Sequence, residues 1–255
     1  MSVLKRYPIL VSIPVLLVIW FATTRLGWIG KSLLADPVEV LRVFGTALRP
    51  QGPTDDVFHH AADTIVRALT GWAIALAIGL AVGLALGLNN VAYRAAEPVL
   101  EFVRSVPPIM AFPPLLVAFS FGPPAYFWTI AVGCAPIMVL SVARGIQQLD
   151  PLRIELLHVH DVARPVRLLA SLVEILPSAF LGARVTFSMS LIIAIVTEMV
   201  FSPRSGFALG SLAKDSEISF ATATFYACVV VLGLYTPAPL ANLLHDASAF
   251  LEADG

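Results

Sequence analysis

Few side chains in this chain could do chemistry, and most of them lie outside its apolar segments. The histidines, all expected in loops or in the C-terminal tail, are His59, His60, His158, His160 and His245. Cys134 and Cys228 lie inside apolar runs, where buried and unreactive thiols are expected rather than a disulfide. The sequence has no cysteine–histidine cluster with zinc spacing and no glycine loop that ends in Lys-Ser or Lys-Thr. It therefore predicts no catalytic residue, no metal site and no cofactor or nucleotide bound by this chain.

Charge gathers in one mid-chain segment, residues 144–167, which lies between two apolar regions. The segment carries four arginines, two histidines, two aspartates and one glutamate. Its apolar residues recur with helical spacing at Leu152, Leu156, Val159 and Ala163. Pro151 suits a first helical position after Asp150, and Pro165 should end or kink the helix. A short amphipathic helix between two membrane segments needs a cover for its apolar face, and we expect a partner protein rather than the bilayer surface.

The composition is that of an integral membrane protein. Of the 255 residues, 58% are hydrophobic and 13% are charged, and the mean hydropathy is +0.86. Soluble domains carry about 25% charged residues. Apolar runs of 18 or more residues are typical of membrane-spanning helices, and the chain has several. The formal net charge of −1 gives no reason to expect nucleic acid as a partner.

The apolar runs predict an all-α integral membrane protein with about six transmembrane helices in a single domain, 1–255. The expected spans are 7–24, 68–88, 105–121, 125–143, 175–201 and 218–244. The first span lies within 1–24, a polar external linker covers 25–62, and a five-span core that includes the charged loop 144–175 covers 63–247. Six spans place both termini on one side of the membrane, and the arginines of the loop favour the cytoplasm for that side.

Two patterns inside the spans indicate close packing and a break. Gly79, Gly83 and Gly87 share one helical face, and small residues at this spacing let membrane helices approach closely. The expected third span is interrupted by Pro107 and Pro108, and again by two further prolines. Such a break frees backbone carbonyls, which is tolerated only where they face protein or a water-filled cavity. The break indicates either a permeation path or a kink needed for packing.

Some single residues have a polar or aromatic character that a span must accommodate. Arg67 opens the second span and Glu198 closes the fifth, both toward the external face, where they form a pair or gate or reach the interface independently. Arg184 is expected to fasten the fifth span to its neighbours. Phe112 belongs to an aromatic belt or to a gate, and Ser188 lines a path or bonds to its own helix.

Several short motifs occur in an order that resembles a known family. They are His60–Arg67, Gly71-Trp72, Glu97-Pro98, Val103–Pro108, Leu149–Pro151, Glu155, Leu176-Pro177, Gly182-Ala183-Arg184 and Glu198-Met199. The set resembles the permease subunit of ATP-binding-cassette importers of the binding-protein-dependent type I family. The most similar group handles nitrate, aliphatic sulfonates, taurine and related small solutes. The resemblance covers residues 55–245 and implies structural roles for Pro177 and Gly182.

The charged loop departs from the family's signature, which runs Glu-Ala-Ala, then glycine, then Leu-Pro. Glu155 matches, Leu156 and Leu157 replace the alanines, and Asp161 stands in place of the glycine. Glycine accepts a positive φ that aspartate adopts less readily, and leucine fills more space than alanine. We therefore expect a docking surface that is shifted in detail and a correspondingly specialised ATPase partner.

The resemblance implies a mechanism in which this chain is not the enzyme. Two cytoplasmic ATP-binding subunits would hold ATP and Mg²⁺ and dock on the coupling helix in the loop. The docking residues would be Asp150, Pro151, Glu155, Leu156, Leu157, Asp161 and Arg164. A second copy of the permease, or a different permease subunit, would complete a path through the lipid, and an external solute-binding protein would deliver the solute. The implied location is the bacterial plasma (inner) membrane, crossed several times.

Two other functional classes are compatible with parts of the sequence. An ion-driven secondary transporter shares the broken helix, but it should carry an ionisable residue near the membrane midplane, where the spans offer little except Arg184. An intramembrane enzyme needs a nucleophile and a base facing each other, and the histidines are outside the spans. An ATP-driven importer for a small, anionic solute is the favoured function. Nitrate, sulfonate, taurine, bicarbonate and neutral pyrimidine-type solutes all stay open as cargo.

Overall fold

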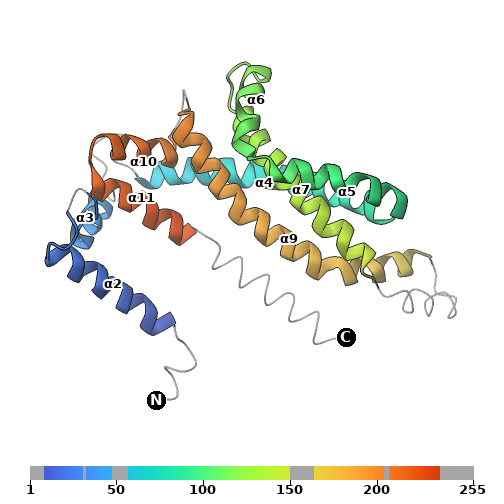
Figure 1. Ribbon diagram of the computed structural model, residues 1–255, viewed down its shortest axis with the longest axis horizontal. Helices are drawn as coiled ribbons and strands as arrows, with labels where there is room; N and C mark the ends of the chain where they lie inside the picture. Colours follow the sequence, from blue (N-terminus) through green and yellow to red (C-terminus); the bar gives the residue numbers. More distant parts are fainter. Residues whose placement is uncertain (1–8, 31–32, 48–56, 150–163, 204–206, 236–255) are drawn as a thin grey trace, which may run out of the picture. The chain divides into compact units, whose positions relative to one another are not determined.

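The computed structural model describes residues 9–30, 33–47, 57–149, 164–203 and 207–235, and every regular element in these ranges is helical (Figure 1). The α-helices are α2 (Ile9–Arg25), α3 (Pro37–Ala47), α4 (Val57–Gly87), α5 (Asn90–Ser105), α6 (Phe112–Ala118), α7 (Pro124–Gln147), α9 (Arg164–Val200), α10 (Leu209–Ile218) and α11 (Thr222–Tyr235). A short 3₁₀ helix, η1, covers Pro108–Ala111. The all-α fold expected from the sequence is thus confirmed.

Three helical segments are long and apolar enough to cross a membrane: Val57–Gly87, Pro124–Gln147 and Ile175–Val200. A fourth crossing is possible where Asn90–Ser105 and Pro108–Ala118 form a pair bent by 92°. Shorter apolar helices occupy Pro14–Arg25 and Thr222–Leu234. The expected total of six spans stays a prediction.

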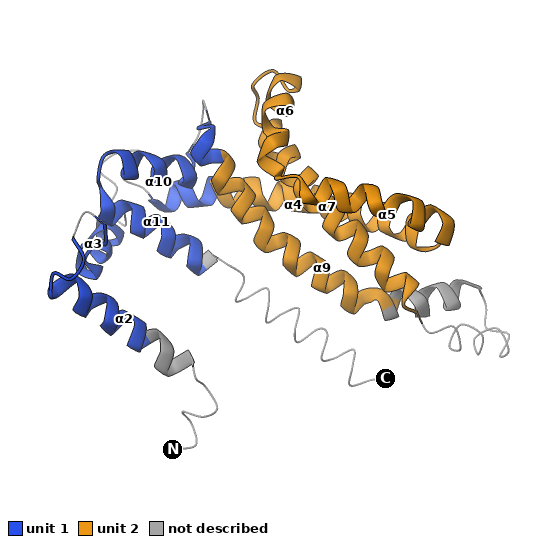
Figure 2. Ribbon diagram, viewed as in Figure 1, with its two compact units in different colours: residues 1–63, 198–235 blue, residues 64–197, 236–255 orange. Residues whose placement is uncertain are grey.

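The chain divides into two compact units (Figure 2). Unit 1 consists of residues 1–63 and 198–235, and unit 2 consists of residues 64–197 and 236–255. Helices α4 and α9 each contribute residues to both units. The long apolar helices lie mainly in unit 2.

In unit 2, α4 and α7 approach each other closely along a stripe of small residues. Gly71, Gly79, Gly83 and Gly87 of α4 face Ile130, Met138, Val142 and Ile146 of α7, in that order. A Cβ added at Gly83 would lie 2.7 Å from Val142 Cβ and 3.0 Å from the Val139 carbonyl oxygen. The contact predicted from the glycine spacing is therefore confirmed. Because contacts advance in the same direction on both helices, α4 and α7 are parallel.

Helix α9 packs on α7 in the opposite direction. Gly145 of α7 faces Ser178, whereas Gly133, nearer the start of α7, faces Ile193. Between these ends, Trp72 Nε1 of α4 donates to the Ala183 carbonyl oxygen of α9 at 3.1 Å. The three long apolar helices thus share one core, whose buried members include residues from all three.

Because α4 and α7 run in the same direction, the chain between them must run back from the end of α4 to the level at which α7 begins. Helix α5 makes this return. Its first turn is capped by Asn89, whose side-chain oxygen accepts the Val91 and Ala92 N–H groups. Helix α5 starts beside the end of α7 and leads to Pro108, which packs against Gly133. The expected third span at 105–121 was therefore placed too late. The polar face of α5 lowers its average hydropathy, which disguises the return helix in the sequence.

The break expected at the prolines is confirmed, although the segment 105–121 is not a single helix. Helix α5 ends at Ser105, and the chain passes through η1 into the short helix α6. Ser120 and Phe121 then adopt positive φ angles of 51° and 61° before Gly122, and Pro124 begins α7. The chain thus turns at Gly122, between the expected spans 105–121 and 125–143.

Unit 1 packs the ends of several helices around a small apolar core. Val57 and Ala61 of α4 contact Leu209 of α10 and Cys228 of α11 in this core. Trp20 Nε1 donates to the Ala35 carbonyl oxygen and ties α2 to the start of α3. The linker expected at 25–62 thus contains the short helix α3.

Two expected boundaries in unit 1 are wrong. His59 and His60 lie in the first turns of α4 rather than in a loop, because Val57 and Ala61 give this segment an apolar helical face. The last span does not begin at Ile218, since α10 ends there. Ala221 N–H donates to the Ser216 carbonyl oxygen and Phe220 adopts a φ of 57°, which closes the helix end before Thr222 opens α11.

We predict that Gly83→Val destabilises the protein by about 1–3 kcal/mol, because the added side chain overlaps α7 where the backbone cannot retreat. Thermal unfolding of the purified protein in detergent measures the effect. Gly45→Val is the matched control, since nothing lies within 4 Å of a Cβ at that glycine. The double substitution Gly83→Val with Val142→Ala should recover part of the loss. Equal effects at Gly45 and Gly83 would contradict the prediction.

Candidate functional site

The broken segment between α5 and α6 presents backbone carbonyls without helical donors. Pro107 and Pro108 have no N–H, so the carbonyls of Val103 and Arg104 lose the bonds that an unbroken helix would give them. Val106 N–H donates to the Val103 oxygen at 3.2 Å and satisfies one of the two. Because unsatisfied carbonyls are excluded from lipid, this side of the break must face protein or water.

The break is held between two of the long helices. A Cβ added at Gly133 of α7 would lie 2.7 Å from both Pro108 and Ile193 of α9. Glycine at this position therefore lets the proline turn enter the contact between α7 and α9. Pro108, one of the predicted pathway residues, is thus fixed at the meeting point of three elements.

Arg67 and Phe112, both predicted near the path, meet at the same aromatic ring. Phe112 is fully buried and packs on Tyr126 with ring centroids 4.8 Å apart. The Arg67 guanidinium lies 6.0 Å from the centroid of the Tyr126 ring. The arrangement is a cation–π contact over a packed aromatic pair. Phe112 therefore fills the interior of unit 2 rather than lying open on its surface.

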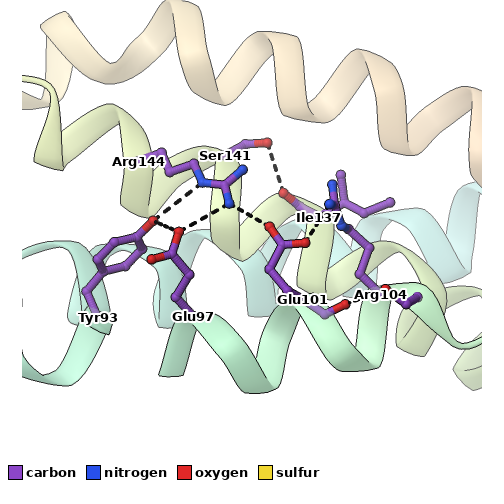
Figure 3. Close-up of polar contacts among 8 residues, drawn as sticks. Tyr93, Glu97, Glu101, Arg104, Ile137, Ser141 and Arg144 are labelled. Atoms are coloured by element: carbon purple, nitrogen blue, oxygen red, sulfur yellow. Dashed lines mark hydrogen bonds and ion pairs between the residues drawn. The ribbon is translucent and has the colours of Figure 1, made fainter. Parts of the chain in front are cut away.

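A charge network joins α5 to the end of α7 (Figure 3). Arg144 donates to Glu97 Oε1 at 3.2 Å and also to Glu101 Oε1. The Tyr93 hydroxyl donates to Glu97 Oε1 at 2.7 Å, and Arg104 binds the second oxygen of Glu101. Two carboxylates thus meet two guanidinium groups, and the network is electrically neutral. This neutrality is what allows a charged helix to pack along α7.

Sequence reasoning missed this network, although part of its signal was visible. Tyr93, Glu97 and Glu101 recur at intervals of four, which places them on one face of a helix. Their common partner, Arg144, is assigned by the sequence to the charged loop, and only the antiparallel packing of α5 on α7 brings it to them.

In unit 1, side chains of α4 and α9 cap the N-terminus of α10. Phe207 N–H donates to Asp63 Oδ2 at 3.1 Å, and Ala208 N–H donates to His60 Nδ1 at 3.0 Å. Gly210 N–H donates to Glu198 Oε2 at 3.1 Å, although the N-cap residue Ala208 has no side-chain acceptor of its own. Glu198 is fully buried. A carboxylate is stabilised at a helix N-terminus by the free N–H groups and the helix dipole.

The cap on α10 defines the position of the Glu198 carboxylate. It does not show whether Glu198 pairs with Arg67, as the sequence predicted. Arg67 belongs to unit 2 and Glu198 to unit 1, so the predicted pair between them stays a prediction.

The other predicted residues include two with expected structural roles, Pro177 and Gly182, and the residues of the expected docking surface. A Cβ at Gly182 would lie 2.6 Å from Ser141 Cβ of α7, so α7 and α9 approach closely there. Pro177 lies exposed within the continuous helix α9. Arg164 is the first residue of α9. The docking residues Asp150, Pro151, Glu155, Leu156, Leu157 and Asp161 lie outside the described residues.

Arg184 and Ser188 lie one turn apart on the outer face of α9, where Arg184 is exposed and Ser188 is half-buried. Within the described part of the chain, Arg184 makes no ion pair or hydrogen bond. The contact expected to fasten the fifth span is therefore not found there.

Comparison with known proteins identifies the family. Residues 73–241 match the model of the binding-protein-dependent transport system inner membrane component. The chain belongs to this family. It is thus a multi-pass permease subunit of the bacterial inner membrane.

The permease is similar over most of its length to several named transport proteins. It is 27% identical to the aliphatic sulfonates transport permease protein SsuC of Escherichia coli strain K12, covering 92% of this chain and 85% of that protein. It is 24% identical to the taurine transport system permease protein TauC of the same strain, covering 88% and 81%. It is 22% identical to the nitrate import permease protein NrtB of Leptolyngbya laminosa, covering 91% and 83%.

A solved structure shares the fold of the permease. An inward-facing structure of the MetNI methionine ABC transporter aligns with a TM-score of 0.61 at 20% identity, covering 76% of this chain and 94% of that chain. A second crystal form gives 0.62. These values establish a common fold.

We predict that Arg144→Gln lowers the free energy of unfolding by about 1–2 kcal/mol, because it leaves two carboxylates against one arginine. The side chains are partly exposed, so the loss is smaller than for a fully buried pair. Glu101→Gln on the Arg144→Gln background should restore part of the loss. Arg104→Gln is the matched control and should cost less, because Arg104 contacts Glu101 alone. A double variant that is no more stable than Arg144→Gln would contradict the network. Thermal unfolding in detergent measures all three variants.

We predict that Glu198→Ala destabilises the start of α10 by about 1–2 kcal/mol, the usual cost of losing an N-terminal cap. Glu198→Gln keeps an acceptor for Gly210 N–H and should cost less. Amide hydrogen exchange over residues 207–218 is the measurement, and it should accelerate in Glu198→Ala. Ser211→Ala, which removes only the bond to the Glu198 carbonyl oxygen, is the control. Unchanged exchange in Glu198→Ala would rule out the cap.

Proposed function

We propose that this permease imports a small solute with an oxyanion group, such as a sulfonate, taurine, nitrate or bicarbonate, and that ATP hydrolysis in separate partner subunits drives the import. Family membership and the named relatives, whose titles specify aliphatic sulfonates, taurine, nitrate and bicarbonate, support this cargo class. A sulfonate, a nitrate and a bicarbonate share a compact anionic head with oxygen acceptors. The common chemistry of these solutes is the basis for the assignment.

The observation that carries the transport mechanism is the parallel contact of α4 and α7 with a broken return segment between them. If the bent pair formed by α5 and α6 counts as one crossing, α4, this pair, α7 and α9 alternate in direction, and the proline break lies between α7 and α9. Broken helices at membrane depth supply polar backbone to a path while the flanking helices stay intact. We infer that the path runs beside Pro108 and the exposed face of α9.

The same packing supports the proposed orientation. Parallel α4 and α7 end on one side of the layer, and α9 begins on that side because it is antiparallel to α7. We therefore infer that the charged loop joins α7 to α9 on the side where α4 ends. Because the loop is rich in arginine, we place it, and both termini, in the cytoplasm.

The partners follow from this orientation. Two ATP-binding subunits dock on the cytoplasmic loop and hold ATP and Mg²⁺, and a solute-binding protein delivers cargo at the opposite face. A second copy of the permease completes the path, with a related but different subunit as the alternative. This chain itself hydrolyses nothing.

Ion-driven transport is the competing mechanism, and the described carboxylates of the spans argue against it. Glu97 and Glu101 are neutralised by arginine, and Glu198 caps α10. A coupling carboxylate must gain and lose an ion during the cycle, which these engagements oppose.

The test is uptake into proteoliposomes that contain the permease, its ATP-binding subunits and its binding protein. We expect uptake of radiolabelled taurine, an alkanesulfonate, nitrate or bicarbonate when ATP is supplied on the side of the membrane that carries the ATP-binding subunits. A non-hydrolysable ATP analogue should give none. Uptake driven by a proton or sodium gradient without ATP would refute the proposal, and so would ATP-driven uptake of neutral solutes alone.

A further inference from the structure

Arg184 has an unusual location for an arginine. It lies within the apolar segment Ile175–Val200, about 13 Å along the helix from Ile175 and about 24 Å from Val200. An extended arginine side chain reaches only about 7 Å. Arg184 therefore cannot bring its charge to either end of the span by snorkelling alone.

Four other arginines in the described ranges have a contact that accounts for their charge. Arg144 and Arg104 contact glutamates, Arg25 contacts Asp36, and Arg67 lies over an aromatic ring. Arg184 has no such contact among the described residues. The groups available to meet its charge are water, a bound anion, another chain and those residues of this chain that lie outside the described ranges.

Lipid is a poor environment for this charge. An arginine at the centre of a membrane helix costs about 2.5–3.5 kcal/mol even on insertion scales. Intramembrane charges accordingly face a protein interior or a water-filled cavity. The exposed face of α9 around Arg184 is therefore a path-lining or interface surface rather than a lipid-facing one.

A hydroxyl group accompanies the charge on this face. Ser188 follows Arg184 by one helical turn, so the two side chains are neighbours on the helix surface. Thr186 donates to the Gly182 carbonyl oxygen, and Ser190 donates to the Phe187 carbonyl oxygen. Ser188, in contrast, makes no side-chain hydrogen bond in the described part of the chain. The two buried hydroxyls nearest to Ser188 are thus satisfied by their own helix, whereas the half-buried hydroxyl of Ser188 is available.

We propose that Arg184 and Ser188 form an oxyanion-contacting site in the translocation path. The planar guanidinium offers paired N–H donors that match the oxygens of a sulfonate, nitrate or carboxylate, and the hydroxyl adds a further donor. Exposed neighbours at Leu181, Val185 and Ile192 give the site an apolar surround, which strengthens the interaction with an anion. This assignment rests on the proposed function, because it takes an anionic cargo as its ligand.

The experiment uses the complete reconstituted importer and measures the solute concentration for half-maximal ATP-driven uptake. Arg184→Gln should raise it by about tenfold or more, the effect of one lost charge-assisted contact. Arg184→Lys keeps the charge and should fall between wild type and Arg184→Gln, and Ser188→Ala should raise it by about twofold to fivefold. Arg42→Gln is the control, since it removes an exposed arginine from α3 and should change nothing. Uptake by Arg184→Gln equal to wild type would overturn the proposal.

A second measurement keeps the proposal testable if Arg184→Gln assembles poorly. Arg184→Cys and Ser188→Cys should react with a negatively charged, membrane-impermeant thiol reagent, and the transported anion should protect them. The native Cys134 and Cys228 are buried and give a low background. Absence of reaction at both positions would overturn the proposal. Loss of subunit assembly in Arg184→Gln, rescued by Arg184→Lys without labelling at Arg184→Cys, would instead place the charge against a carboxylate of a neighbouring subunit.

The two proposals fail in distinguishable ways. Wild-type vesicles that import no oxyanion with ATP would refute the proposed function and the anionic ligand together. Wild-type vesicles that import an oxyanion normally, with Arg184→Gln unaffected, would refute the site alone.

Discussion

The close approach of α4 and α7 is the contact on which the rest of unit 2 depends. Lipid offers no hydrophobic gain for bringing two apolar helices together, so van der Waals contact between small and large side chains must hold them. Glycines at Gly71, Gly79, Gly83 and Gly87 remove the side chains that would separate the backbones. Because the contact is parallel, it determines the direction of everything between the two helices. A returning segment becomes obligatory, and α9 must then begin where α7 ends.

The returning segment explains why charged side chains lie beside this core. Helix α5 carries two glutamates that α7 matches with Arg144, and Arg104 completes the balance. The charged side chains of α5 are thus stabilised by ion pairs rather than replaced by apolar residues. Beyond α5, the prolines exchange helical hydrogen bonds for a turn that fits against Gly133. One end of the segment is held by electrostatics and the other by packing.

The sequence predicted features whose cause is local and missed those whose cause is distant. Glycine spacing and consecutive prolines act on their own helix, so the α4 contact surface and the break were predictable. Helix α5 was not included in an expected span because hydropathy averages over charges whose partners lie on another helix. The cap on α10 was missed because His60 and Ala208 are 148 residues apart in sequence. The docking residues of the charged loop lie outside the described part of the chain and stay predictions.

The pairing of α5 with α7 also has a consequence for biosynthesis. Glu101 leaves the ribosome 43 residues before Arg144, so for that interval its carboxylate has no arginine from α7. Arg104 of α5 can pair with Glu101 meanwhile, but the arginine that binds Glu97 comes from α7, and a helix with an unmatched glutamate partitions poorly into the bilayer. We therefore expect helix α5 to stay at the insertion machinery, or at its aqueous border, until α7 emerges. The two helices then enter the membrane as one cooperative step, so the order of synthesis differs from the order of integration.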